Sequence, residues 1–149
     1  PPKSKSSWPR CRGVFKPLDG FVPHVVQREI MDTLKVLPAV FYRTPAGEEP
    51  VRTWLRALDK EDRTLAGEAI KAVEFGWPIG MPVCRSLAGV RDVWEVRFSL
   101  TRKRIARVLF YVKAGNMILL HGFVKKTQKT PQRDIDLAVQ RKKEHDSHG

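Results

Sequence analysis

The spacing of apolar residues predicts two consecutive helices in the first half of the chain. Between residues 51 and 58, apolar side chains recur at intervals of three and four, as on one face of a helix, at Val51, Trp54, Leu55 and Leu58. Pro50 suits the first turn of this helix. Asp59 is a suitable N-cap for a second helix, which is predicted to end at Gly76, Trp77 and Pro78. The two segments together predict a helical hairpin.

From residue 93 onward the alternation of apolar and polar residues has a period of two, which is typical of strands. In residues 93–100 the apolar positions alternate with Glu95, Arg97 and Ser99, so these three side chains must point to the opposite face. Two further apolar runs follow, at 105–112 and 117–124. Because the loops between these runs are only a few residues long, the three strands are predicted to form an antiparallel meander.

Two elements complete the predicted fold. A first strand is predicted at 36–43, either at an edge or starting after Pro38, because the proline interrupts it. A final helix is predicted to open at Thr130 and Pro131. The predicted order is therefore strand, helix, helix, strand, strand, strand, helix. This order indicates an α+β fold with a small antiparallel sheet, helices packed on one face and the other face partly open.

The first 34 residues differ from the remainder of the chain. Five prolines and scattered Lys and Arg residues give this segment little regular period before Val26, Ile30 and Leu34. We expect residues 1–34 to form a basic N-terminal extension that is partly disordered or contains a short helix. Residues 35–149 are expected to form one folded domain, for which the overall apolar content of 42% is sufficient.

Composition excludes several classes of protein from the prediction. Cys11 and Cys84 are far apart and have no further Cys or His at metal-ligand spacing, which argues against a disulfide framework or a zinc site. No apolar run approaches the roughly 20 residues that span a bilayer, and the first residues do not resemble a signal sequence. We therefore expect a cytoplasmic protein that has no membrane partner and no cofactor.

Positive charge is concentrated in one part of the chain. The segment between Glu95 and Asp134 contains ten Lys or Arg residues and no carboxylate, whereas the whole chain has 28 basic and 16 acidic residues. The remainder therefore has 28 − 10 = 18 basic and 16 acidic residues, which is nearly neutral. A field of one sign on one segment favours polyanionic partners, of which nucleic acid is the commonest.

Standard catalytic motifs are missing from the sequence. There is no Gly-rich phosphate loop, no His-Glu-x-x-His motif and no Gly-x-Ser-x-Gly motif, and the predicted strands offer only Asp92 and Glu95 as carboxylates. A two-metal nuclease is therefore disfavoured, and no metal site is predicted. The remaining possibility is action on a phosphodiester through cations that hold the phosphate and stabilise charge on its oxygens.

Three side chains on the predicted strands are candidates for this chemistry, and each has a simpler explanation. Arg97 could bind phosphate or pair with a carboxylate on a solvated sheet face. Arg107 lies in an apolar run, so it needs a partner and is more informative. His121 could transfer a proton or be a core histidine bonded to backbone. Whether the three share one face depends on strand register.

Further basic residues lie in loops and are candidates for contacts to RNA phosphates, although they could equally serve solubility. They are Arg102, Lys103 and Arg104 in the first hairpin loop, and Lys125 and Lys129 after the last strand.

Several segments of the chain together resemble a known family. They are Phe41 to Gly47, Glu74 to Pro78, Val93 to Arg97, Arg104 to Phe110 and Leu120 to Pro131. This combination resembles the phage-derived Gp49-like, or HigB, branch of the RelE/ParE toxin superfamily over about residues 36–145. The resemblance implies a RelE-like fold and the toxin of a bacterial type II toxin-antitoxin system.

The resemblance also implies an activity and partners. RelE-like toxins enter the ribosome and cleave mRNA by promoting attack of a 2′-hydroxyl on the adjacent phosphate, without a metal. A helix-turn-helix, HigA-like antitoxin is implied as the cognate partner, with operator DNA bound only through that antitoxin. By position, Arg97 matches a residue that contacts substrate or acts as base, Arg107 matches the ligand of the scissile phosphate, and Lys126 falls near a residue that stabilises the transition state.

Two departures from the RelE pattern leave alternatives open. Glu95 stands where RelE has a lysine, and the tyrosine near the RelE C-terminus is absent, so His121 is the hypothesised group for proton transfer. An inhibitor of DNA gyrase of the ParE type, without nuclease activity, is the main alternative. A simple nucleic-acid-binding module is the third, and it would predict salt-dependent binding without growth arrest.

Overall fold

A computed structural model of the chain describes residues 34–125 and 129–148. The contacts within the chain divide it into two units, Pro1–Leu34 and Lys35–Gly149, and the described elements belong to the second. The predictions for the N-terminal extension at 1–33 and for Lys126 concern residues outside the described ones.

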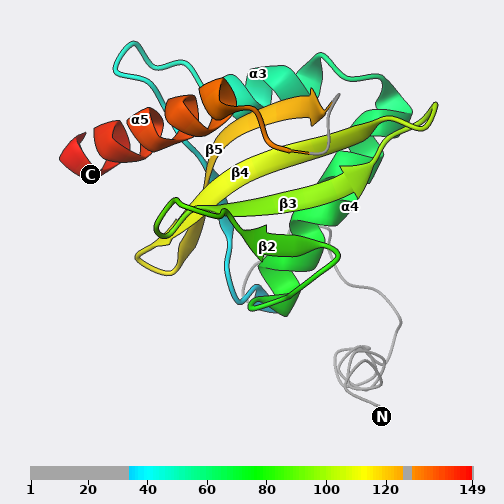
Figure 1. Cartoon of the computed structure of the whole chain (residues 1–149), viewed down its shortest axis with the longest axis horizontal. Helices are drawn as coiled ribbons and strands as arrows, with labels where there is room; N and C mark the ends of the chain where they lie inside the picture. The colour runs from blue at the N-terminus through cyan, green and yellow to red at the C-terminus, as the bar shows by residue number, and fades with distance from the viewer. Residues whose placement is uncertain (1–33, 126–128, 149) are drawn as a thin grey trace, which may run out of the picture. The chain divides into compact units, whose positions relative to one another are not determined.

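The described residues of the second unit form a five-stranded sheet and three helices, which confirms the predicted α+β class. In chain order the elements are β1 (Ala39–Phe41), α3 (Pro50–Arg56), α4 (Lys60–Gly76), β2 (Cys84–Ser86), β3 (Trp94–Ser99), β4 (Ile105–Lys113), β5 (Asn116–Lys125) and α5 (Gln132–His148). The strands are ordered β1-β5-β4-β3-β2 across the sheet (Figure 1).

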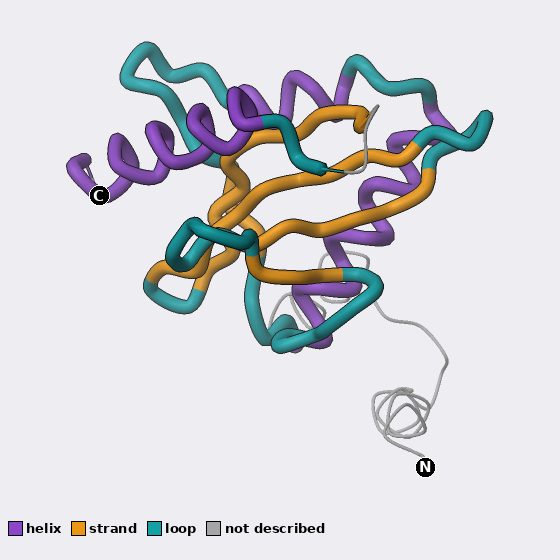
Figure 2. The backbone as a smooth tube through the Cα atoms, viewed as in Figure 1, coloured by secondary structure: helices purple, strands orange, loops and turns teal. Residues whose placement is uncertain are grey.

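The predicted meander of β3, β4 and β5 is present, with antiparallel pairing throughout. These are the three long neighbouring strands in Figure 2, joined by short loops. The loops are tight turns in which both central residues have positive φ, at Arg102 (60°) and Lys103 (57°) and at Ala114 (53°) and Gly115 (77°). Turns of this hand match the twist of the flanking strands, which explains why such short connections suffice.

The sheet differs from the prediction at both edges. Strand β1 pairs with β5 in parallel, so the sheet is mixed rather than antiparallel. Strand β2 was not predicted, and it pairs antiparallel with β3. Both edge strands are three residues long, too short to show an alternation, and β1 pairs with a strand far away in sequence.

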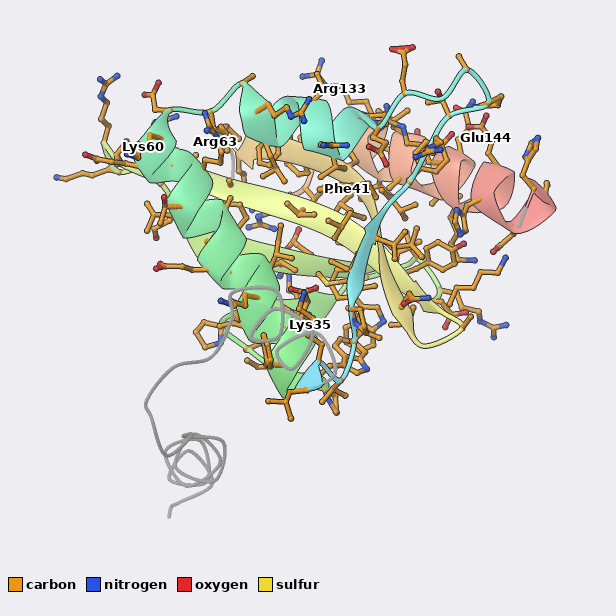
Figure 3. All side chains as sticks on the ribbon, turned by 180° about the vertical axis from the view of Figure 1, so that it is seen from behind. Lys35, Phe41, Lys60, Arg63, Arg133 and Glu144 are labelled. Carbon is orange, nitrogen blue, oxygen red and sulfur yellow. The ribbon has the colours of Figure 1, made fainter. Side chains whose placement is uncertain are left out.

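The prediction that all helices pack on one face is wrong, because α5 lies on the face opposite α3 and α4. Figure 1 shows α5 crossing in front of β5, and the reverse view in Figure 3 shows α3 and α4 in front of the sheet. The core between the sheet and helices α3 and α4 contains Val51, Ile70, Val73, Val96, Val108, Phe110, Met117 and Leu119. The core on the opposite face, which carries α5, contains Tyr42, Leu109, Tyr111, Ile118, Leu120 and Ala138. Both faces of the central strands are therefore apolar, which explains their nearly continuous apolar sequences.

Helix α4 begins and ends where the sequence predicts. Asp59 occupies the N-cap position, although its side chain makes no capping hydrogen bond, and Trp77 follows the last helical residue. Lys35, labelled near the end of α4 in Figure 3, forms an ion pair of 3.3 Å with Glu74 of this helix. The Glu74 carboxylate also accepts a hydrogen bond of 2.7 Å from the Ala39 backbone N–H. These contacts attach the edge strand β1 to the helix layer.

The close contact between α3 and β5 depends on a glycine. A Cβ atom at Gly122 would lie 2.5 Å from Cε3 of Trp54, well inside van der Waals distance. The Trp54 ring therefore rests directly on the β5 backbone, and no other residue type fits at position 122 without movement of the ring.

A bulge in β5 determines which side chains face α5. Leu109 pairs with His121 and Phe110 pairs with Leu119, so Leu120 is an extra residue in β5. Leu120 belongs to the core under α5, and the neighbouring His121 also contacts α5. The consecutive residues Leu120 and His121 therefore both point to the face that carries α5. After them the side chains alternate between the two faces again, so Phe123 and Lys125 also point to the face of α5.

Candidate functional site

Charged side chains from four neighbouring strands meet on the sheet face that carries α5. The strand register places Arg85 of β2 opposite Glu95 of β3, and Arg97 of β3 opposite Arg107 of β4. Residues opposite one another in a ladder share a face of the sheet. Lys125, at the end of β5, interacts electrostatically with all four of these side chains. We call Arg85, Glu95, Arg97, Arg107 and Lys125 the charged cluster.

Glu95 is the centre of the charged cluster and is fully buried. Its Oε1 accepts hydrogen bonds from Arg107 Nη1 at 2.6 Å and from Arg85 Nε at 2.8 Å. Its Oε2 accepts a bond of 2.6 Å from the hydroxyl of Thr130, which in turn accepts one of 3.1 Å from Arg107. Burial alone raises the pKa of Glu95, but the hydrogen bonds from Arg107, Thr130 and Arg85 outweigh it, so the pKa lies below its ordinary value.

The charged cluster carries an excess of positive charge despite Glu95. Four cations and one carboxylate leave 4 − 1 = 3 positive charges when Lys125 is protonated. The Arg85 side chain is 38% exposed and Arg97 is partly exposed, whereas Arg107 is 2% exposed. Arg97 and Arg107 are like charges directly opposite each other, an arrangement that is unfavourable without an anion nearby. The arrangement suits an anion that contacts Arg85 and Arg97 from the solvent side.

Lys125 is unusual among the described cations. Its Nζ atom is buried and has no hydrogen-bond partner among the described residues. Burial lowers the pKa of Lys125, the charges of Arg107, Arg85 and Arg97 lower it further, and only Glu95 opposes this effect.

The structure brings together Arg97, Arg107 and Lys125 of the predicted site residues. The partner that Arg107 was predicted to need is Glu95. Because Arg107 is almost fully buried, it lies beneath the exposed cations of the charged cluster rather than at the surface. The structure describes no position for Lys126.

His121 lies on the same face, but its ring already contacts two neighbouring side chains. Its Nε2 is 2.7 Å from Asp134 Oδ1 of α5, and its ring stacks on Phe123 with centroids 5.4 Å apart. Burial lowers the pKa of His121, although Asp134 acts in the opposite direction. His121 pairs with Leu109, whereas Arg107 pairs with Phe123, so His121 is displaced along the strands from the charged cluster.

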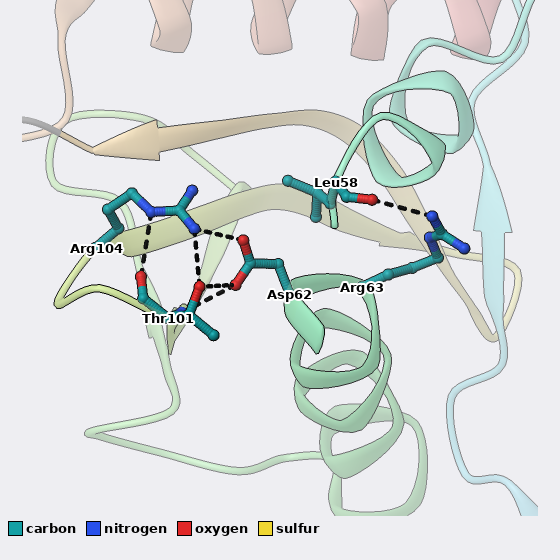
Figure 4. A network of polar contacts seen from close by, with 5 residues as sticks. All are labelled: Leu58, Asp62, Arg63, Thr101 and Arg104. Atoms are coloured by element: carbon teal, nitrogen blue, oxygen red, sulfur yellow. Dashed lines mark hydrogen bonds and ion pairs between the residues drawn. The ribbon is translucent and has the colours of Figure 1, made fainter. Parts of the chain in front are cut away.

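The predicted RNA-binding residues of the first hairpin loop have different environments. Arg102 and Lys103 are exposed at the tip of the loop. Arg104 instead forms an ion pair with Asp62 of α4, and Thr101 donates hydrogen bonds of 2.9 Å to Asp62 from both its backbone N–H and its hydroxyl (Figure 4). The carboxylate of Asp62 is buried at 1% exposure. It therefore fixes the base of the loop, and Arg104 is committed to that contact. Lys129 is exposed just before α5.

Sequence reasoning missed Arg85, Thr130 and the position of Glu95 at the centre. Arg85 lies in β2, whose three residues carry no periodic signal. Thr130 has a sequence signal only as part of a helix start, and nothing local indicates that its hydroxyl bridges Glu95 and Arg107. Among the described residues, no group of three or more His, Cys, Asp or Glu side chains is placed to hold a metal ion. Within the same residues, no helix is both long and apolar enough to cross a membrane.

Comparison with known proteins finds a match to the model of a protein family. No protein of curated function matches the chain significantly. The family model described as phage-derived protein Gp49-like (DUF891) matches residues 53–143, a range that includes all five residues of the charged cluster. This match covers more than half of the chain and extends from α3 into α5. The chain therefore belongs to the phage-derived Gp49-like family, a family of RelE/HigB-like toxins.

Proposed function

We propose that this protein is the toxin of a bacterial type II toxin-antitoxin system and that it cleaves ribosome-bound mRNA. The observation that carries the proposal is the charged cluster, in which the partly exposed Arg85 and Arg97 lie above a buried ion pair on an otherwise apolar sheet face. Membership of a RelE/HigB-like toxin family supports it.

The chemistry that fits the charged cluster is internal cleavage of RNA without a metal. Arg85 and Arg97 hold the scissile phosphate through its non-bridging oxygens. The 2′-hydroxyl of the preceding nucleotide attacks the phosphorus, and the bond to the 5′-oxygen breaks to leave a 2′,3′-cyclic phosphate. Guanidinium groups stabilise the negative charge that develops on the phosphoryl oxygens. Arg107 contributes from beneath, through its charge and through its hold on Glu95.

The exposed tip of the first hairpin loop supports binding rather than cleavage. Arg102 and Lys103 are held at the surface by the contacts of Asp62, and we assign them to phosphates of the RNA backbone. A helix-turn-helix antitoxin is the proposed cognate partner, and operator DNA is bound only through it.

A translation reaction with purified ribosomes tests the proposal. The protein is added to ribosomes programmed with a defined message, and the ends of the message are mapped by primer extension. We expect truncated message, and we expect the double variant Arg85→Ala, Arg97→Ala to lose cleavage by at least about 100-fold. Lys71→Ala, at an exposed position of α4 on the other face of the sheet, is the matched control and should cut like the parent. Intact message with the parent protein would refute the proposal.

Inhibition of DNA gyrase is a second candidate, and one observation favours it. Arg107, the residue that resemblance assigns to the scissile phosphate, is only 2% exposed and is paired with Glu95. A buried ion pair at this position is compatible with a protein that binds its target without cutting RNA. Accumulation of cleaved DNA–gyrase complexes on addition of the protein, with message left intact, would select this function.

A further inference from the structure

Cleavage by a 2′-hydroxyl requires a group that takes the hydroxyl proton, and most of the charged cluster is unsuited to this role. Arg85, Arg97 and Arg107 carry guanidinium groups, which are hydrogen-bond donors without an acceptor atom. They can stabilise charge but cannot accept a proton. The question of the proton acceptor therefore concerns Glu95, His121 and Lys125.

Glu95 and His121 are both occupied. The two carboxylate oxygens of Glu95 accept three hydrogen bonds within the protein, and these lower its pKa, which makes it a weak base. His121 is bonded to Asp134 beneath α5, two pairs along the β4–β5 ladder from Arg107. Glu95 is fully buried and His121 is displaced along the strands, so neither group faces a phosphate held by Arg85 and Arg97.

Lys125 meets the requirement on both its position and the surroundings of its amine. It lies at the end of β5 on the face of the charged cluster, and its Nζ has no hydrogen-bond partner among the described residues. The side chain as a whole is only partly buried, so its flexible stem can carry the amine toward a ligand at the surface. An unpaired, poorly hydrated amine among three guanidinium groups favours the neutral form.

We propose that Lys125 is the proton acceptor of the cleavage reaction, a role that rests on the proposed RNA cleavage. The neutral amine takes the proton of the 2′-hydroxyl, and the oxygen forms a bond to the adjacent phosphorus. The bond from phosphorus to the 5′-oxygen breaks, and the leaving oxygen takes a proton from solvent. The Lys125 ammonium then returns its proton to solvent, so that no net proton is gained or lost.

The pH dependence follows from the groups that face Lys125. They are Arg85 of β2, Glu95 and Arg97 of β3 and Arg107 of β4, and Thr130 before α5 is uncharged but bonded to Glu95 and Arg107. Burial and the three arginines lower the pKa of Lys125, and Glu95 raises it. The proton acceptor is therefore active at a lower pH than an ordinary lysine, whose pKa is about 10.4.

The test compares Lys125→Arg with the parent in single-turnover cleavage of ribosome-bound message between pH 6 and 9. Arginine preserves the positive charge but cannot accept a proton. For the parent, kcat/KM should rise about tenfold per pH unit and level off at the pKa of Lys125 in the free protein. For Lys125→Arg we expect a loss of roughly 100- to 10,000-fold and a flat profile. Lys71→Arg, on the helix of the opposite face, is the matched control and should retain the parental profile.

Binding and titration separate a chemical role from a structural one. Lys125→Arg should still bind a message that carries a 2′-deoxy nucleotide at the cleavage position, because its charge is retained. In the parent, titration of the lysine ¹³Cε resonances by NMR should place Lys125 below the other lysines, at the midpoint of the kcat/KM profile. This second measurement needs no variant to fold.

The outcomes distinguish this inference from the proposed function. If the parent cuts and Lys125→Arg cuts with the same pH profile, Lys125 is not the acceptor, although the nuclease function stands. If Glu95→Gln alone abolishes the pH-dependent limb, or if Lys125 titrates near 10.4, the inference is also overturned. If the parent leaves ribosome-bound message intact at every pH, the proposed function itself fails.

Discussion

The buried pair of Glu95 and Arg107 makes a prediction about stability that does not depend on the function. Replacing Glu95 by Leu removes the carboxylate and leaves the Arg107 guanidinium buried at 2% exposure without the carboxylate that pairs with it, although Arg107 still donates to the hydroxyl of Thr130. Breaking a buried ion pair from one side costs about 3–5 kcal/mol, because the remaining charge is not solvated. Since small domains have a free energy of unfolding of about 5–15 kcal/mol, this variant should be severely destabilised.

The double variant Glu95→Leu, Arg107→Met separates the cost of the stranded charge from the loss of packing. Replacing both members of a buried pair by apolar residues is often neutral or stabilising. The double variant should therefore recover most of the lost stability, with a coupling free energy of about 2 kcal/mol or more. Arg85→Met is the matched control, because Arg85 is 38% exposed and its pair with Glu95 should contribute about 1 kcal/mol or less.

Urea denaturation followed by tryptophan fluorescence and circular dichroism measures these quantities. Each variant requires coincident transitions by the two probes, so that a two-state free energy is defined. A loss below about 1 kcal/mol in Glu95→Leu, or a double variant as unstable as the sum of the single ones, would refute the buried pair as described.

Four further predictions follow from other contacts. Asp62→Asn should loosen the base of the first hairpin loop, since the carboxylate accepts two bonds from Thr101 and pairs with Arg104, and faster amide exchange at Thr101 checks this. Gly122→Ala should lower the free energy of unfolding by about 1–3 kcal/mol, measured in urea, because the added methyl group meets the Trp54 ring. The pKa values of Glu95 and Asp62 are lowered in the folded state, so their stabilising effect is complete above the unfolded pKa values near 4 and is lost as the pH falls through the folded values. The urea concentration at the unfolding midpoint should therefore decrease when the pH is lowered below about 4. Arg102→Ala with Lys103→Ala should reduce the slope of log affinity for single-stranded RNA against log salt by about 1.4, and an unchanged slope in filter binding would remove these residues from the RNA contact.

Local sequence patterns predicted the elements whose length exceeds a few residues. Helices α3 and α4, strands β3 to β5 and helix α5 each repeat an apolar spacing often enough to be recognised. Strand β2 was missed because three residues contain no period, and the parallel pairing of β1 was missed because its partner β5 lies far away in the chain. The position of α5 also escaped, since its apolar stripe indicates that it packs on a sheet but not on which face.

The site shows the same division between local and distant information. The alternation in β3 predicted that Glu95 and Arg97 share a face, and the isolated arginine in β4 predicted a partner for Arg107. The identity of that partner required the register of β3 against β4. Arg85 lies on the short strand β2, which has no periodic signal, and Thr130 lies next to β3 only in the folded chain. Polar networks of this kind depend on tertiary contacts that a single sequence does not display.

The bulge at Leu120 has a consequence for comparing this chain with its relatives. Ile118 and Lys125 are separated by an odd number of positions, yet both lie on the face that carries α5, because the strand contains one surplus residue. In a homologue without that residue, the cation equivalent to Lys125 would lie one position earlier in an ungapped sequence alignment. An ungapped alignment would then match Lys125 to a side chain that points into the opposite core, so the correct alignment opens a gap at Leu120.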